Sequence, residues 1–248
     1  MSGHSKWATI KHKKGALDAK RGKIFTRLIR EIAMAAKTGG DPDKNPRLRT
    51  AIVAAKAENM PADNIKRAIQ RGTGELPGAT YEEFQLEGYG PGGVAVLVEL
   101  STDNRNRTVS EIRHVFGKHG GNLGEAGSVA WMFHKKGSII VPKAAAKEDD
   151  LTNVVLESGG EDLRDDGENW EIITDPHGYE AVLEAVKKAK YAVSTSEVAM
   201  LPQNYIKLEG QQVAQMIRRM EALEEQDDVQ HVYSNFDVDV KQLEEVAG

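Results

Sequence analysis

Residues 84–100, FQLEGYGPGGVAVLVEL, contain two hydrophobic runs separated by the glycine-rich stretch 88–93. Aliphatic and β-branched residues in such short runs favour strands, and glycine suits a tight connection between them. We therefore expect strands at Phe84–Glu87 and Val94–Leu100 with a turn between them. The turn is not followed by Gly-Lys-Ser/Thr and leads from strand to strand, so it is neither a Walker A loop nor a dinucleotide-binding fingerprint.

Upstream of these strands the hydrophobic period is that of helices. The segment Gly72–Ala79 is rich in Gly and Pro and predicts a linker. Before it, helices are predicted over 17–37, from Asn45-Pro46 onward, and from Pro61 to Gly72, with Asn45 as a cap and Pro46 at the first helical position. The first helix places Ile24, Phe25 and Leu28 on one side and basic residues on the other.

Downstream of the strands, helices and strands alternate. A helix is predicted over 109–119, started by a Thr108/Glu111 capping box. Further strands are expected at 129–134, at 139–141, near 163, at 171–174, at 193–198 and at 229–236. Further helices are expected at 148–158, 179–188 and 211–224. The elements from 139 to 198 follow the order β-α-β-β-α-β, the ferredoxin-like split βαβ.

The predicted fold class is thus α+β and multidomain. A basic helical bundle at 1–78 precedes two small α+β domains of the split βαβ type. The third domain, at 136–203, is inserted in the second, which is formed by 79–135 plus 204–238.

Charge is distributed unevenly between these parts. The whole chain has a net charge of −5, but residues 1–75 hold 17 of the 33 Lys and Arg and only 7 of the 38 Asp and Glu. The first part therefore carries +10 and the remainder −15. A Lys- and Arg-dense module is typical of a protein that binds polyphosphates. The alternative is that these cations only solubilise a helical surface.

Two segments are candidate nucleic-acid contacts. The first is a basic N-terminal arm followed by the basic face of the first helix, where Trp7 either stacks on a base or packs the arm onto the bundle. Its residues are His4, Lys6, Trp7, Lys11, His12, Lys13, Lys14, Lys20, Arg21, Lys23, Arg27 and Arg30.

The second segment is a loop before a helix, at Asn104, Arg105, Asn106 and Arg107. A helix N-terminus and two guanidinium groups would favour a phosphate. The alternative is that both arginines pair with nearby acids.

Signatures of catalysis are missing from the sequence. The chain has no Cys, which removes disulfide scaffolds, thiolate zinc sites and cysteine nucleophiles. No His-Glu-x-x-His or Gly-x-Ser-x-Gly occurs. We expect no enzyme activity, no metal, no cofactor and no small-molecule substrate.

The longest aliphatic run, Val94–Val98, is far below the roughly 20 residues of a membrane span, and the sequence shows no secretory signal. We therefore expect a cytoplasmic protein without a membrane partner.

Long strings of this sequence resemble the YebC/PmpR family. They are GHSKWATIKHKKGALDAKRGKIFTRLIREI at 3–32, NPRLRTAI at 45–52, EGYGPGGVAVLVE at 87–99, TDNRNRT at 102–108 and KHGGNLGEAGSVAWMF at 118–133. That family includes bacterial probable transcriptional regulatory proteins and a mitochondrial translational activator of cytochrome oxidase. The resemblance implies three domains, the third inserted in the second, and nucleic-acid binding without catalysis.

Three functions follow from these observations. The first is a DNA-binding regulator of transcription, which the family's usual name favours. The second, which the resemblance also implies, is a ribosome-associated factor that binds ribosomal or transfer RNA and assists translation of difficult sequences such as proline runs. Phosphate-directed charge and small linked domains suit the recognition of structured RNA. The third is a protein-interaction scaffold. We expect a non-enzymatic, nucleic-acid-binding regulator of gene expression. Whether its ligand is DNA or structured RNA, and whether it binds the ribosome, is left open.

Overall fold

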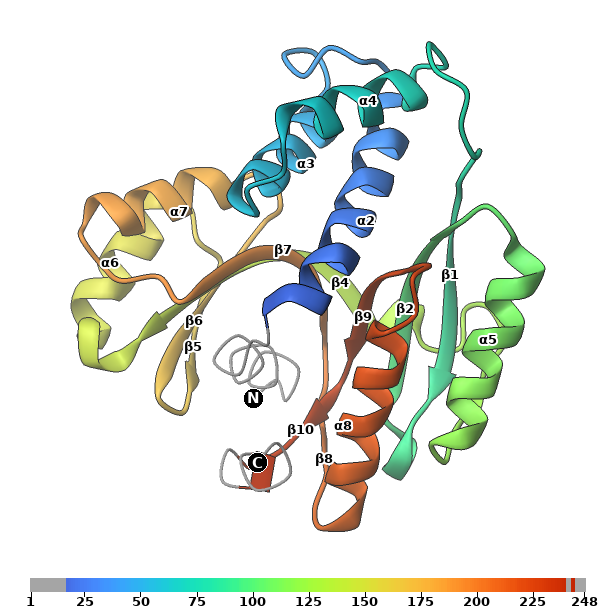
Figure 1. The fold of residues 1–248 in the computed structure, drawn as a ribbon. Coiled ribbons are helices and arrows are strands. Elements are labelled where there is room, and N and C mark those ends of the chain that lie inside the picture. Colours follow the sequence, from blue (N-terminus) through green and yellow to red (C-terminus); the bar gives the residue numbers. More distant parts are fainter. Residues whose placement is uncertain (1–16, 240–241, 244–248) are drawn as a thin grey trace.

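The N-terminal part of the described chain is helical. The computed structural model describes residues 17–239 and 242–243. Helices α2 (Leu17–Ala36), α3 (Pro46–Ala57) and α4 (Ala62–Gly72) lie together at the top of Figure 1. Ile32, Leu48 and Ile65 belong to the buried core that the three helices share. The Asn45 side chain accepts a hydrogen bond from the Leu48 amide at 3.0 Å, so the predicted start of α3 is confirmed.

The first sheet is antiparallel and has the strand order β3-β1-β2-β9. Its strands are β1 (Glu82–Tyr89), β2 (Ala95–Thr102), β3 (Asn122–Leu123) and β9 (Val229–Ser234). Helices α5 (Arg105–Lys118) and α8 (Gln211–Glu224) cover one face through a large apolar core. Segments more than a hundred residues apart in the sequence therefore share one sheet.

Strand β2 is buried on both faces because two layers cover it. Val96 and Val98 contact the core under α5 and α8. Ala95 and Leu97, on the opposite face, pack with Phe133 and its neighbours. This explains why residues 94–98 form an uninterrupted aliphatic run.

The predicted turn between β1 and β2 is confirmed. It contains the 3₁₀ helix Pro91–Gly93, in which Gly92 and Gly93 have φ of 67° and 79°. These angles favour glycine. Gly88 is required for another reason, since a Cβ there would lie 2.5 Å from the Phe116 ring.

The second sheet has the strand order β5-β6-β4-β7 and is also antiparallel. Its strands are β4 (Phe133–Pro142), β5 (Asp162–Asp166), β6 (Asn169–Thr174) and β7 (Thr195–Pro202). The sheet and its helices α6 (Glu148–Ser158) and α7 (Tyr179–Lys188) form the left part of Figure 1. Chain order and sheet order agree with the expected split βαβ.

The remaining elements are short. Strands β8 (Ile206–Lys207) and β10 (Phe236–Asp237) form a parallel pair. Ala130–Met132 and Lys143–Ala145 are 3₁₀ helices that flank β4. The division at 1–78, 79–135 plus 204–238, and 136–203 stays a prediction. Within residues 17–239 and 242–243, no helix is long and apolar enough to cross a bilayer.

Two sequence expectations are wrong in detail. Helix α5 begins at Arg105 rather than Val109, because the Asn104 side chain caps it by accepting a hydrogen bond from the Arg107 amide at 3.1 Å. The expected capping box does not form, and the Thr108 hydroxyl donates elsewhere. In addition, 129–134 and 139–141 are not separate strands. Residues Phe133–Pro142 instead form one continuous strand, β4, because the polar residues between the two predicted strands also pair with β7.

Candidate nucleic-acid interface

Helix α2 lies beside the segment that leads from α8 into β9 (Figure 1), and its basic side chains contact that segment. Lys23 Nζ donates to the Glu225 carbonyl at 2.9 Å, and the Arg27 guanidinium donates to the Glu224 carbonyl. Arg30 Nη1 donates to the Asp227 carbonyl. Three cations of the predicted binding face are therefore held by backbone carbonyls of the same chain.

The chemistry of a helix C-terminus explains this contact. The last carbonyls of a helix lack intrahelical donors and carry partial negative charge. Helix α8 has no basic residue in its last turn. The side chains of α2 supply the missing donors from about 200 positions away in the sequence. Burial lowers the pKa of Arg27, and Glu224 and Asp227 oppose that shift.

Asp228 lies at the centre of this contact. Its carboxylate pairs with Arg30 at 2.9 Å and with Arg107 at 3.0 Å. The hydroxyls of Thr108 and Thr102 donate to it at 2.6 and 2.9 Å. Burial raises the pKa of Asp228, but these hydrogen bonds and the charge of Arg30 outweigh it and hold the pKa below the ordinary 3.8. Asp228 thus joins the helical part to the first sheet.

The candidate loop at 104–107 is largely occupied by its own contacts. Asn104 caps α5, and Arg107 pairs with Asp103 as well as Asp228. Arg105 lies 3.5 Å from Glu82 and over the ring of Phe84. Asn106 is exposed. Both arginines therefore have acidic partners, as the alternative interpretation expected.

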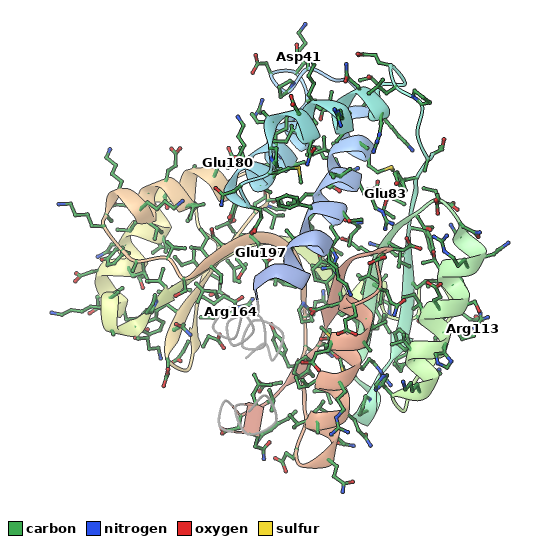
Figure 2. The ribbon with its side chains drawn as sticks, in the orientation of Figure 1. Asp41, Glu83, Arg113, Arg164, Glu180 and Glu197 are labelled. Carbon is green, nitrogen blue, oxygen red and sulfur yellow. The ribbon has the colours of Figure 1, made fainter. Side chains whose placement is uncertain are left out.

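Arg47 forms a second bridge between the helices and the first sheet. Its guanidinium bonds Glu31 of α2 at 2.8 Å and also binds Glu83, which Figure 2 shows between α2 and β1. The hydrogen bonds that Arg47 donates to these two carboxylates raise the pKa of Arg47 above its usual value. Arg47 is consequently held by ion pairs.

The outer face of α3 and α4 has a different character. Among the described residues, four exposed cations of these helices have neither an acidic partner within ion-pair distance nor a carbonyl acceptor, whereas Arg49 of α3 donates to the Pro42 carbonyl at 2.9 Å. They are Lys56, Lys66, Arg67 and Arg71. On α4 they lie opposite the buried Ile65 and Ala68. We call these four residues the α3–α4 cation face. The lack of a hydrogen-bonded partner distinguishes these cations from Lys23, Arg27 and Arg30 of α2.

Part of the predicted site lies beyond these observations. The arm residues His4, Lys6, Trp7, Lys11, His12, Lys13 and Lys14 fall outside the described residues. Lys20 and Arg21 lie in the first turns of α2, but their side chains are not described. Nucleic-acid binding by these residues stays a prediction.

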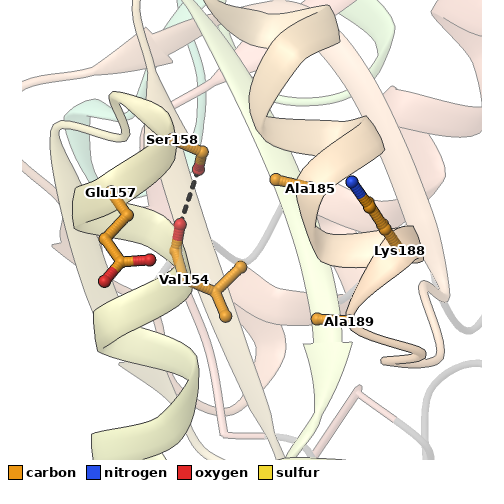
Figure 3. Close-up of a pocket in the computed structure, with 6 residues that line it drawn as sticks. All are labelled: Val154, Glu157, Ser158, Ala185, Lys188 and Ala189. Atoms are coloured by element: carbon orange, nitrogen blue, oxygen red, sulfur yellow. Dashed lines mark hydrogen bonds between the residues drawn. The ribbon is translucent and has the colours of Figure 1, made fainter.

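A shallow groove between α6 and α7 offers little chemistry. It encloses about 410 Å³, and Figure 3 shows Ser158 in its lining with its hydroxyl donating to the Val154 carbonyl at 2.7 Å. A nucleophile needs an adjacent base to become reactive, and Ser158 is instead bonded to backbone. Across the described residues, no three His, Cys, Asp or Glu are grouped to hold a metal ion.

Comparisons with known proteins cover nearly the whole chain. A family model described as TACO1/YebC protein N-terminal domain matches residues 5–75, and one described as TACO1/YebC second and third domain matches 81–236. A probable transcriptional regulatory protein of Koribacter versatilis is 76% identical over 248 residues, all of both chains. One from Acidobacterium capsulatum is 69% identical over the same span.

A crystal structure also resembles this chain. A conserved hypothetical protein from Aquifex aeolicus has a TM-score of 0.77 and 46% identity, over 90% of this chain and 92% of that one. The mixed helices and antiparallel sheets described above are therefore shared with an experimentally determined fold.

Proposed function

This chain belongs to the TACO1/YebC family, and from that premise we propose that it is a cytoplasmic, non-enzymatic regulator of gene expression that binds nucleic acid through the α3–α4 cation face. The names of its relatives support a regulatory role in general. The observation that carries the proposal is the contrast between two basic faces. Lys23 and Arg27 of α2 donate to carbonyls at the end of α8, whereas the four residues of the α3–α4 cation face remain available for phosphates.

The relatives' names favour DNA as the ligand, and DNA-directed regulation of transcription is the first candidate. A second candidate, a translation factor that binds structured RNA at the ribosome, is favoured by the position of α2. Sequence-specific readers place a helix in the major groove. One side of α2, the 20-residue helix, packs in the helical core and the other contacts α8. Lys and Arg on α4 suit phosphates, which position a protein without specifying sequence.

Replacing Lys66, Arg67 and Arg71 together with Gln is expected to weaken nucleic-acid binding about tenfold or more at 0.1 M salt. Each lost phosphate contact reduces the slope of log affinity against log salt by about 0.9 on B-form DNA, so three contacts reduce it by about 2.7. Fluorescence anisotropy on a 20-base-pair DNA duplex and the matching RNA duplex, over a salt series, measures both effects.

The control is the triple Gln variant of Lys187, Lys188 and Lys190, exposed residues at the end of α7. It removes the same charge from another surface and should bind as the wild type does. Equal losses in both variants, or no loss in either, would contradict the α3–α4 assignment. A larger effect on RNA than on DNA favours the translation factor, and the reverse favours the transcriptional regulator.

A further inference from the structure

Trp131 is an exposed aromatic side chain whose position the fold fixes. It is 63% exposed and lies in the 3₁₀ helix Ala130–Met132, just before β4. A tryptophan usually buries most of its large apolar surface. Exposing this apolar ring to water is unfavourable, and a binding partner that covers the ring would account for its position.

The backbone around Trp131 is held by a buried carboxylate. Glu87 of β1 accepts hydrogen bonds from the amides of Gly127, Val129 and Ala130 at 2.6 to 2.7 Å. Burial raises the pKa of Glu87, but these three hydrogen bonds outweigh it and lower the pKa overall. An ionised carboxylate that bonds three amides within residues 127–130 limits the motion of the segment that carries the indole.

The indole itself is also oriented. Trp131 Nε1 donates to the Ser128 carbonyl at 3.2 Å, and the Tyr89 hydroxyl donates to the same carbonyl at 3.2 Å. A side chain that is ordered before binding loses less entropy when a partner arrives. The ring is thus presented as a fixed flat surface.

Exposed polar side chains lie near Trp131 along the chain and on the loop that follows β7. His134 and Lys135 are exposed a few residues further on, and the Gln203 amide donates to the Met132 carbonyl at 2.9 Å, which brings the loop after β7 beside the 3₁₀ helix. The Gln203 side chain is exposed and contacts the His134 ring. Amide, imidazole and ammonium groups are those that bind base edges and phosphates.

The surroundings favour a nucleobase over a protein partner. The other large exposed hydrophobic residues of the described chain are Val53, Leu76 and Leu156, on the helical part, the linker and α6. A protein interface usually needs a contiguous apolar centre, which a single indole among polar groups does not provide. Stacking of one base needs only one flat aromatic face.

We propose that Trp131 is a stacking platform for one unpaired nucleobase of a single-stranded nucleic acid. The inference rests on the proposed function and adds a base contact to the phosphate contacts of the α3–α4 cation face. It therefore assigns unpaired strands, rather than duplexes alone, to the ligands of this protein.

The test compares two ligands on three variants. The probes are a 12-nucleotide oligoadenylate and an abasic ribose-phosphate chain of the same length. Trp131→Ala is expected to weaken binding to oligoadenylate about tenfold, because one stacked base contributes about 1–3 kcal/mol, and to leave binding to the abasic chain unchanged. Trp131→Phe keeps an aromatic face and should lose less. Leu156→Ala removes an equally exposed hydrophobic residue elsewhere and is the control.

The outcomes separate this inference from the proposed function. A loss confined to oligoadenylate supports stacking. An equal loss on both chains, or no loss on either, overturns it, and the latter makes a protein partner the next candidate for Trp131. If Trp131→Ala binds normally while the α4 triple variant does not, the inference fails and the proposed function stands. If the wild-type protein binds neither oligomer nor duplex, the proposed function fails.

Discussion

Replacing Arg219 with Met is expected to lower the free energy of unfolding by about 2–4 kcal/mol. Arg219 is fully buried in α8, and its guanidinium donates to the carbonyls of Tyr89, Phe116 and His119. Met keeps an unbranched apolar side chain about as long as the aliphatic stem of Arg, but it donates no hydrogen bond. The variant therefore removes one donor from three carbonyls, of which that of Phe116 keeps a hydrogen bond from the Gly121 amide at 3.0 Å. Each buried acceptor that is left unsatisfied costs about 1–3 kcal/mol, with losses that are not fully additive.

The position of Arg219 explains why the loss is large. It satisfies the last carbonyls of α5 and the end of β1 at once, so it ties a helix to a strand. Burial lowers the pKa of Arg219 to about 10, which still leaves it charged at neutral pH. The backbone packs closely against the guanidinium, since a Cβ at Gly121 would collide with the Tyr89 carbonyl and with the guanidinium itself. Another side chain cannot easily take over the same space.

Arg218→Met is the matched control because Arg218 is the exposed neighbour on the same helix. Chemical denaturation monitored by circular dichroism should place the Arg218 variant near the wild type, within about 0.5 kcal/mol. Arg219→Lys should lie between, since an ammonium group donates but lacks the planar fork. Equal unfolding midpoints for the Arg219 and Arg218 variants would contradict the role assigned to the three carbonyls.

Sequence pattern alone predicts the helices with regular amphipathic stripes. The ranges 148–158, 179–188 and 211–224 are those of α6, α7 and α8. Within such stripes hydrophobic spacing locates both the helix and its buried side. The start of α5 is missed because Asn104 and Thr108 are both good caps. Sequence pattern does not show that the Thr108 hydroxyl bonds the buried carboxylate of Asp228, which lies 120 residues away.

The candidate site is less accessible to such reasoning. The spacing of Lys23, Arg27 and Arg30 predicts a basic face on the first helix, and the structure shows that face against α8. Hydrophobic periodicity shows which side of a helix is polar. It does not show whether that side faces solvent or the carbonyls of a segment about 200 residues away in the sequence. Sequence reasoning also misses Arg219. A charged residue is usually exposed, but Arg219 is the largest fully buried side chain among the described residues.

Replacing Asp228 with Ala is expected to destabilise the protein by about 3–5 kcal/mol, because it leaves the nearly buried Arg30 guanidinium without its carboxylate partner. The Arg30 and Asp228 side chains are only 12% and 6% exposed. The same change should loosen the helices from the first sheet, since Asp228 holds Arg30 of α2 and Arg107 of α5 together. Native-state proteolysis of the exposed linker at 73–80 should therefore quicken by up to about a hundredfold, the factor that about 3 kcal/mol of local stability represents.

Asp227→Asn is the control for this second prediction. Asp227 is exposed, and its backbone carbonyl, which the substitution leaves in place, is the group that binds Arg30. Removal of that charge should change neither unfolding nor cleavage of the linker appreciably. If both Asp variants unfolded and were cleaved alike, net charge rather than the hydrogen-bonded carboxylate would explain the effect.

The pH dependence of the Asp228 effect follows from the direction of its pKa shift. The folded state holds the pKa of this carboxyl below 3.8, so the unfolded chain takes up its proton first as the pH falls. Its contribution is therefore complete above the unfolded value and is lost as the pH falls through the folded pKa. In denaturation series, Asp228→Asn should be less stable than the wild type by the same margin at pH 7 and at pH 5.5, and the margin should shrink below about pH 4. A margin that stayed constant down to the acid transition would mean that the loss comes from packing and not from the ionised carboxylate between Arg30 and Arg107.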